Sequence, residues 1–191
     1  RSTLFPYTTL FRSMTASASI LSRALGKGDK ATVDNVMGNL VFWVIIFSVI
    51  IIAAGIILAP YFLSMVGAEG EIKALGVRYL RVLFLGSLFV NFTQSANMVM
   101  RGEGLMKTAM LIMGFGALLN IVLDPILMIA MGDRAIEGAA LATIIAQLVQ
   151  ATVTLYYFTK KSKNVKIHEI KPDKDIYGEM FGIGASAMMM Q

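Results

Sequence analysis

The sequence predicts an all-α, polytopic helical membrane protein, and two observations support this fold class. Hydrophobic residues make up 57% of the 191 residues and charged residues only 15%, whereas a soluble domain carries about 25% charged residues. Four long stretches also contain no charge, at 35–68, 82–100, 108–123 and 138–159. Such stretches approach or exceed the roughly 20 residues that a helix needs to cross a bilayer, and they lack the alternation of barrel strands.

The same composition excludes other classes of protein. A chain this apolar, with no cysteine, is neither a soluble enzyme nor a secreted disulfide scaffold nor a disordered segment. The net charge of +5 lies mainly in connections between apolar stretches, where basic residues set membrane topology, so we expect no nucleic-acid partner. The sequence shows no nucleotide-binding loop, His or Cys metal cluster or nucleophile triad. We therefore expect no enzymatic activity and no cofactor.

The predicted elements follow one another with short polar connections. Residues 14–25 form the tail of a helix, and the polar turn 26–30 closes it. In the first complete span we expect Pro60 to end the helix, because proline cannot continue the hydrogen-bond ladder. Lys73, Arg78 and Arg81 are expected to lead into the second span, and Asp124-Pro125 interrupts the third. The predicted spans are Asn35–Pro60, Val82–Met100, Thr108–Met131 and Gly138–Thr159.

The two ends of the chain differ from this pattern. Residues 1–13, RSTLFPYTTLFRS, resemble a translated library-adapter sequence and have no signal-peptide features, so we exclude them from the fold. Residues 160–175 form a basic loop, and 176–191 begin a further apolar span that stops short. We therefore expect the chain to be a fragment of a longer protein.

Charge predicts the orientation. Arg23 and the connections after Leu25, Met100 and Thr159 together hold eleven basic residues, and the connections between them hold four. By the positive-inside rule, the first set is cytoplasmic.

Asp124 is the strongest candidate for a functional residue. A carboxylate inside an apolar span costs at least a few kcal/mol and usually marks an ion or substrate pathway. Asn120 lies one turn earlier on the same face, and Pro125 should kink or open the helix and free carbonyl oxygens. These groups predict a site for a cation or a proton, which would compete for the carboxylate. The alternative is that Asp124 caps a helix near the outer membrane face, close to Asp133 and Arg134.

Two further polar or small-residue patterns are open to two interpretations. In the second span a polar arc either binds a ligand or joins helices; it comprises Ser87, Asn91, Gln94 and Ser95, with Asn97 at its edge. In the fourth span Gly138, Ala142 and Ala146 form a seam that lets another helix approach closely, and Thr143 lies beside it. The residues alone favour a packing role for Thr143.

Over residues 16–191 the chain resembles the multidrug and toxic compound extrusion (MATE) family. The resemblance rests on four segments: SRALGKGDKA at 22–31, MRGEG at 100–104, ALLNIVLDPILM at 117–128 and EGAALATIIAQ at 137–147. It implies a twelve-helix transporter of two six-helix lobes. Residues 14–159 would then be most of the amino-terminal lobe (the end of helix 2 and helices 3–6), 160–175 the cytoplasmic inter-lobe loop and 176–191 the start of helix 7.

The resemblance also implies functional residues. Asp124 and Asn120 match the helix 5 members of a site for H+ or Na+, Asn97 the helix 4 asparagine and Thr143 the helix 6 threonine. The helix 1 aspartate of that site falls outside this sequence. The implied function is antiport of H+ or Na+ against organic cations and amphipathic drugs across the inner (plasma) membrane, in partnership with helix 1 and the second lobe.

Two alternatives to drug efflux have different sequence requirements. A lipid-linked oligosaccharide flippase shares the architecture but usually has a more cationic central cavity, whereas these spans contain an acid and no internal Lys or Arg. A non-transporting membrane scaffold would explain the small-residue seam but not a carboxylate inside an apolar span.

Overall fold

The computed structural model describes residues 20–162, and this range is helical, as the sequence predicts. A short helix at 20–27 precedes the longer ones. They are α2 (Lys30–Met65), α3 (Gly70–Leu85), α4 (Ser87–Gly102), α5 (Met106–Met131) and α6 (Ala135–Tyr156), with a 3-10 turn η1 (Gly132–Arg134) before α6 and a π-helical segment η2 (Tyr157–Lys161) after it. The predictions for 1–13 and 176–191, and for nearly all of the loop 160–175, fall outside the described residues.

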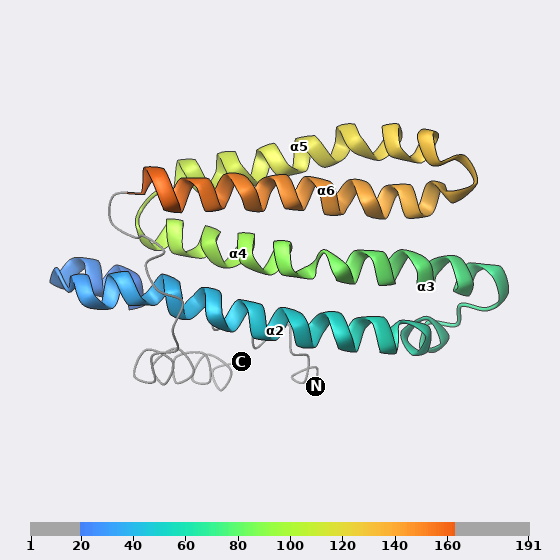
Figure 1. Ribbon diagram of the computed structural model, residues 1–191, viewed down its shortest axis with the longest axis horizontal. Coiled ribbons are helices and arrows are strands. Elements are labelled where there is room, and N and C mark those ends of the chain that lie inside the picture. Colours follow the sequence, from blue (N-terminus) through green and yellow to red (C-terminus); the bar gives the residue numbers. More distant parts are fainter. Residues whose placement is uncertain (1–19, 163–191) are drawn as a thin grey trace.

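The helices form an antiparallel bundle (Figure 1). The bent unit α3–α4 lies between α2 and α6, and α5 packs along α6. The starts of α2 and α5 and the ends of α4 and α6 lie at the same end of the bundle. The basic residues at those termini therefore share one end, in agreement with the grouping that the charge count predicts; they are Lys30, Arg101, Lys107, Lys160 and Lys161.

The described helices are long and apolar enough to cross a membrane. Asn35–Met65 qualifies by length and hydropathy, and so does the stretch Met106–Lys161, which contains the antiparallel pair α5 and α6. Helices α3 and α4 qualify together as one span, bent by 49°. Large apolar side chains such as Ile57, Ile121 and Ile129 are exposed on the protein, as is expected of surfaces that face lipid. The chain is thus a multi-pass membrane protein.

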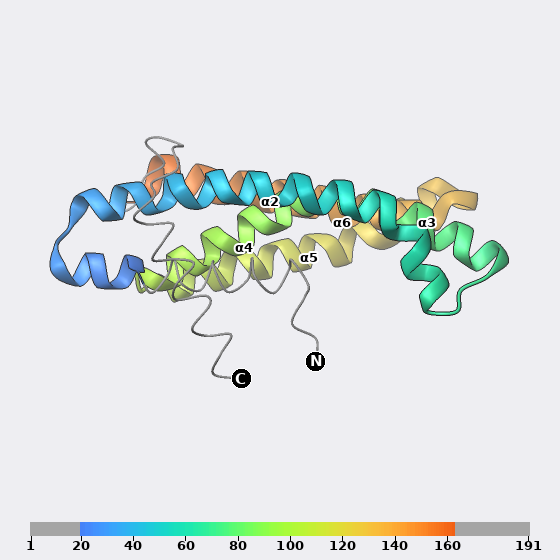
Figure 2. The ribbon, with the colours of Figure 1, turned by 90° about the horizontal axis from the view of Figure 1, so that it is seen from below.

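The core lies toward the basic end, where the short helix 20–27 folds back beneath α2 (Figure 2). Leu21, Met37, Met100 and Phe158 are almost completely buried there, so this first helix, α2, α4 and η2 share one apolar cluster. This cluster holds together the ends of elements that are distant in the sequence.

The prediction that Pro60 ends the first span is wrong. Helix α2 continues through Pro60 to Met65, because neighbouring groups in a membrane helix tolerate the loss of one backbone bond. The helix ends instead at Met65, and Gly67, the residue after the C-cap Val66, has a φ of +82°. There the amide of Ala68 donates to the carbonyl of Leu63 (2.9 Å) and that of Gly67 to Ser64 (3.0 Å), the pattern of a Schellman cap.

Two other expectations about helix limits also need correction. The charged residues Lys73, Arg78 and Arg81 do not precede a helix but lie within α3, whose straight-chain and basic residues favour helix even outside the apolar run. Helix α5 does not open at Asp124-Pro125, since it remains one helix over Met106–Met131. Proline there removes a single hydrogen bond, which is not enough to end a helix packed along its whole length against α6.

Candidate ion-binding site

The side chains of Asn120, Asp124 and Thr143 form one hydrogen-bonded network between α5 and α6. The amide nitrogen Nδ2 of Asn120 donates to Oδ1 of Asp124 on the next turn of α5 (3.3 Å). The same nitrogen donates across the helix interface to Oγ1 of Thr143 (3.3 Å). All three residues are partly buried. The helical spacing that places Asn120 and Asp124 on one face is therefore realised, and α6 adds a third oxygen.

The hydrogen-bond donors of this network already have acceptors, whereas several of its oxygen atoms can accept a further bond. The Thr143 hydroxyl donates its hydrogen to the carbonyl of Ala139 (3.1 Å), so toward Asn120 it can only accept. Asn120 directs its nitrogen to both partners, which leaves its carbonyl oxygen Oδ1 as a further acceptor. A carboxylate, an amide oxygen and a hydroxyl oxygen thus lie together, and these are the ligand types that hard cations prefer.

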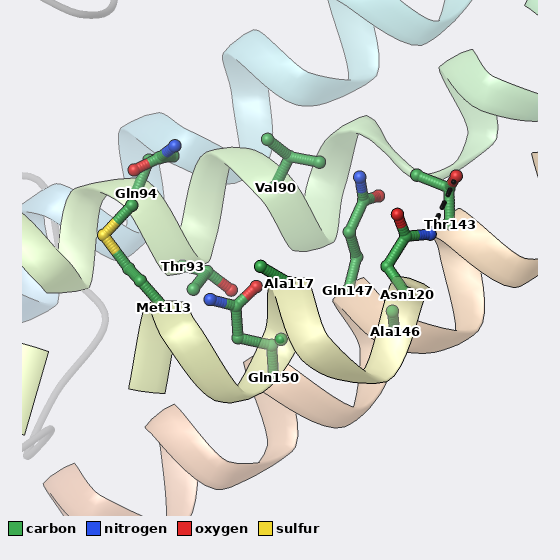
Figure 3. Close-up of a pocket in the computed structure, with 11 residues that line it drawn as sticks. Val90, Thr93, Gln94, Met113, Ala117, Asn120, Thr143, Ala146, Gln147 and Gln150 are labelled. Carbon is green, nitrogen blue, oxygen red and sulfur yellow. Dashed lines mark hydrogen bonds between the residues drawn. The ribbon is translucent and has the colours of Figure 1, made fainter. Parts of the chain in front are cut away.

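A polar cavity of about 240 Å³ lies beside this network, between α4, α5 and α6 (Figure 3). Its lining includes Asn120 and Thr143 but not Asp124, so Asn120 connects the carboxylate to the cavity. No lining residue is charged. The remaining polar lining consists of amides and a hydroxyl: Thr93 and Gln94 from α4, and Gln147 and Gln150 from α6.

Gln147 is a lining residue that the sequence analysis did not single out. Its Oε1 is buried and has no hydrogen-bond partner within the described part of the chain. It lies one turn beyond Thr143 on α6 and packs against Gly86, where a Cβ would come within 2.9 Å of that oxygen. A buried acceptor without a donor is costly in a protein interior. Of the cavity's lining atoms, this oxygen is therefore the one that most needs a hydrogen bond or a cation from a bound water, ion or ligand.

The polar arc of the second predicted span divides between two faces of α4. Asn91 is buried and its Nδ2 donates to Oγ of Ser48 on α2 (2.9 Å), which joins the two helices. Gln94 lines the cavity. Asn97 is also buried, but its Nδ2 donates to the backbone carbonyl of Ala109 near the start of α5 (3.0 Å). At 1.5 Å per residue, Ala109 is about 22 Å from Asp124 along α5.

The structure therefore brings together three of the four predicted site residues. Asn120, Asp124 and Thr143 are linked, whereas Asn97 lies with the packed basic end of the bundle. From α4, the polar residues that line the same cavity as Asn120 and Thr143 are Thr93 and Gln94.

The small-residue seam fixes the separation of α5 and α6 next to the network. Gly138, Ala142 and Ala146 are buried. At Gly138 a Cβ would come within 2.7 Å of the carbonyl oxygen of Leu127, which is backbone and cannot rotate away. The seam predicted from the four-residue spacing thus brings the helix backbones close enough for the Asn120 amide to reach Thr143.

Comparison with known proteins decides the family. The sequence pattern of the MatE family matches residues 2–126. The chain belongs to the MatE family. It is 32% identical over 176 residues to the multidrug export protein MepA of Staphylococcus aureus (strain bovine RF122 / ET3-1), an alignment that covers 91% of this chain and 39% of MepA. The chain thus spans about two-fifths of the length of this curated relative.

Solved structures of MATE family transporters share this fold. An inward-facing conformation of a multidrug resistance MATE family transporter matches with a TM-score of 0.83 and 30% identity, over 95% of this chain and 43% of that one. An outward-facing conformation of a multidrug resistance MATE family transporter matches with a TM-score of 0.85 and 29% identity, over 96% and 41%. The chain thus matches the inward-facing and the outward-facing structure with similar TM-scores.

Proposed function

We propose that this chain is most of the amino-terminal lobe of a secondary active transporter that exports organic cations and other amphipathic drugs from a bacterial cell, coupled to entry of H+ or Na+. Membership of the MatE family supports this, as does the similarity to a protein named as a multidrug exporter. Residues 160–175 would be the cytoplasmic loop to the second lobe, which starts at 176–191. Helix 1 and that second lobe complete the transporter in the inner membrane.

The observation that carries the coupling site is the Asn120 amide that joins Asp124 to Thr143. The Asp124 carboxylate would take up either a proton or a Na+, and the oxygens of Asn120 and Thr143 would complete the coordination of Na+. Because the network lies beside a neutral polar cavity, a change of charge at Asp124 would not be compensated by another charge in the lining. Ion binding would thereby favour one access state of the transporter over the other.

Transport of an organic cation dye tests this function. A full-length transporter that carries this lobe is expressed in a drug-sensitive host, and dye efflux is followed while H+ and Na+ gradients are imposed separately. Asp124→Asn should abolish gradient-driven efflux, because an amide is close in shape but takes up no proton at neutral pH and has no negative charge to attract Na+. Asp133→Asn is the matched control, since Asp133 is exposed in η1 and lies outside the network.

Each result has a definite consequence. Efflux that depends on one gradient and is lost in Asp124→Asn but not in Asp133→Asn supports the proposal and identifies the ion. Efflux that persists unchanged in Asp124→Asn removes this carboxylate from coupling. A well-expressed wild type without dye efflux contradicts drug export and favours the flippase.

A further inference from the structure

A second hollow lies on the opposite side of α4 from the polar cavity. It has a volume of about 300 Å³ and is lined by α2, α4 and α6. Its walls include Val44 and Ile45 of α2 and Leu148 and Leu155 of α6, and Phe89 and Phe92 of α4 form its floor. No lining residue is charged, and Thr152, the one polar residue, donates its hydroxyl hydrogen to the carbonyl of Leu148 in its own helix (2.8 Å). The hollow therefore offers no free side-chain hydrogen-bond donor to a ligand.

This hollow is a groove because α2 and α6 do not close over α4. No Cα atoms of α2 and α6 lie within 8 Å of each other, although each helix contacts α4. In Figure 1 α4 lies between the other two helices, and Figure 2 shows α2 and α6 together on one side of the bundle with α4 below them. Ile45, Leu148 and Leu155 are exposed by 42%, 44% and 46%. The groove is thus open at the surface of the chain.

The groove points toward the basic end of the bundle. From Leu148 to Leu155 it runs about 10 Å along α6, which is most of one leaflet of a hydrocarbon core about 30 Å thick. Lys160 and Lys161 lie in the next turn, in η2, and both are exposed. Lys30 begins α2, the other wall, at the same end. The end of the groove at Leu155 is therefore about 7 Å along the chain from Lys160 and Lys161, whereas Lys30 lies about 16 Å beyond Val41, the nearest lining residue of α2.

We propose that this groove binds one acyl chain of an anionic phospholipid from the leaflet at the basic end, with its phosphate at Lys160 and Lys161. The positive charge of the lysines beyond Leu155 would favour an anionic headgroup, and the apolar lining without a free hydrogen-bond donor suits a hydrocarbon chain rather than a polar segment of protein. The proposal rests on the membrane fold and the groove, and it does not depend on drug efflux.

Quenching by brominated phospholipids tests the site in the 191-residue chain. Trp43 is the single tryptophan of the sequence, so Trp43→Phe gives a silent background. Leu148→Trp then reports on the groove, and Leu155→Trp is a second reporter in case the first fails to fold. Leu118→Trp is the control, because Leu118 is 62% exposed on α5 away from the groove. It lies about 18 Å from the basic end, close to the depth of Leu148.

The chain is reconstituted in mixtures of brominated phosphatidylglycerol or phosphatidylcholine with their unbrominated forms. We expect the groove reporters to prefer phosphatidylglycerol by about five-fold, and the preference to disappear in Lys160→Gln/Lys161→Gln. At Leu118→Trp the two lipids should quench equally. Equal quenching by both lipids in the groove, a preference that survives the lysine substitutions, or the same preference at Leu118→Trp would each overturn the proposal.

Discussion

The side-chain nitrogen of Asn120 on α5 lies 3.3 Å from the hydroxyl oxygen of Thr143 on α6, and this hydrogen bond joins the two helices next to Asp124. Thr143→Val keeps the shape of the side chain and removes the acceptor. We expect the free energy of unfolding to fall by about 1 kcal/mol, the usual range for a hydrogen bond between membrane helices. Unfolding of the purified chain by SDS in mixed micelles measures this change.

The same helix offers a control for this substitution. Thr152→Val removes a hydroxyl that bonds only to the carbonyl of Leu148 within α6, so its cost should stay below about 0.5 kcal/mol. A double-mutant cycle of Thr143→Val with Asn120→Ala should give a coupling energy of about 0.5–1.5 kcal/mol. Additive effects would show that the two side chains do not interact.

Gly138→Ala should destabilise the chain by about 1–3 kcal/mol, because the new methyl group would come within 2.7 Å of the backbone oxygen of Leu127. Helices α5 and α6 must then move apart. Gly114→Ala on α5 is the matched control, since nothing lies within 4 Å of its Cβ position. That substitution should be neutral or stabilising by up to about 1 kcal/mol. Equal losses of stability in the two variants would contradict the close approach.

Ser48→Ala should cost about 1 kcal/mol of unfolding free energy, since it leaves the buried amide of Asn91 without its acceptor on α2. Ser64→Ala lies on the same helix and removes a hydroxyl that bonds only to the carbonyl of Pro60 one turn earlier. It should change stability by less than about 0.5 kcal/mol. The same SDS titration measures the unfolding free energy of both variants. An unchanged free energy in Ser48→Ala would show that Asn91 does not join α4 to α2.

The sequence predicts those helices that depend on apolar length and misses features that depend on local geometry. The charge-free stretches locate α2, α5 and α6, because a bilayer demands long uninterrupted apolar helices. Helix α3 is not found by this criterion, since Lys73, Arg78 and Arg81 lie inside it. Pro60 does not end the helix, because a helix can tolerate the loss of one backbone N–H donor. Gly67 does mark the end, because a φ of +82° lies outside the helical range.

The sequence predicts those parts of the candidate ion-binding site that lie on a single helix. Four-residue spacing places Asn120 beside Asp124 without any knowledge of packing. It cannot show which side of α4 faces α5 and α6, so Asn97 and Gln94 could not be ranked until the helices were packed. Gln147 carried a usable signal, because Thr143, Gln147 and Gln150 recur at helical spacing on one face of α6.

Gln147→Leu separates a structural role from a binding role in the cavity. The substitution removes a buried oxygen that has no hydrogen-bond partner among the described residues, so stability should be unchanged or higher by up to about 1 kcal/mol. If the oxygen serves a bound ion, water or ligand, ion-driven dye efflux by the full-length transporter should fall several-fold at equal expression. Unchanged efflux would show that this oxygen has no part in transport.

The central claim is that the carboxylate of Asp124 binds the coupling ion. A hydrophobic carbodiimide reacts with protonated carboxyl groups within the membrane, and mass spectrometry of the full-length transporter quantifies the product at Asp124. We predict labelling that increases as pH falls, with protection by Na+ at constant ionic strength if Na+ shares the site. The exposed Asp133 should show no Na+ protection. An Asp124 that stays unlabelled at every pH, or labels to the same extent at every pH and Na+ concentration, would contradict the claim.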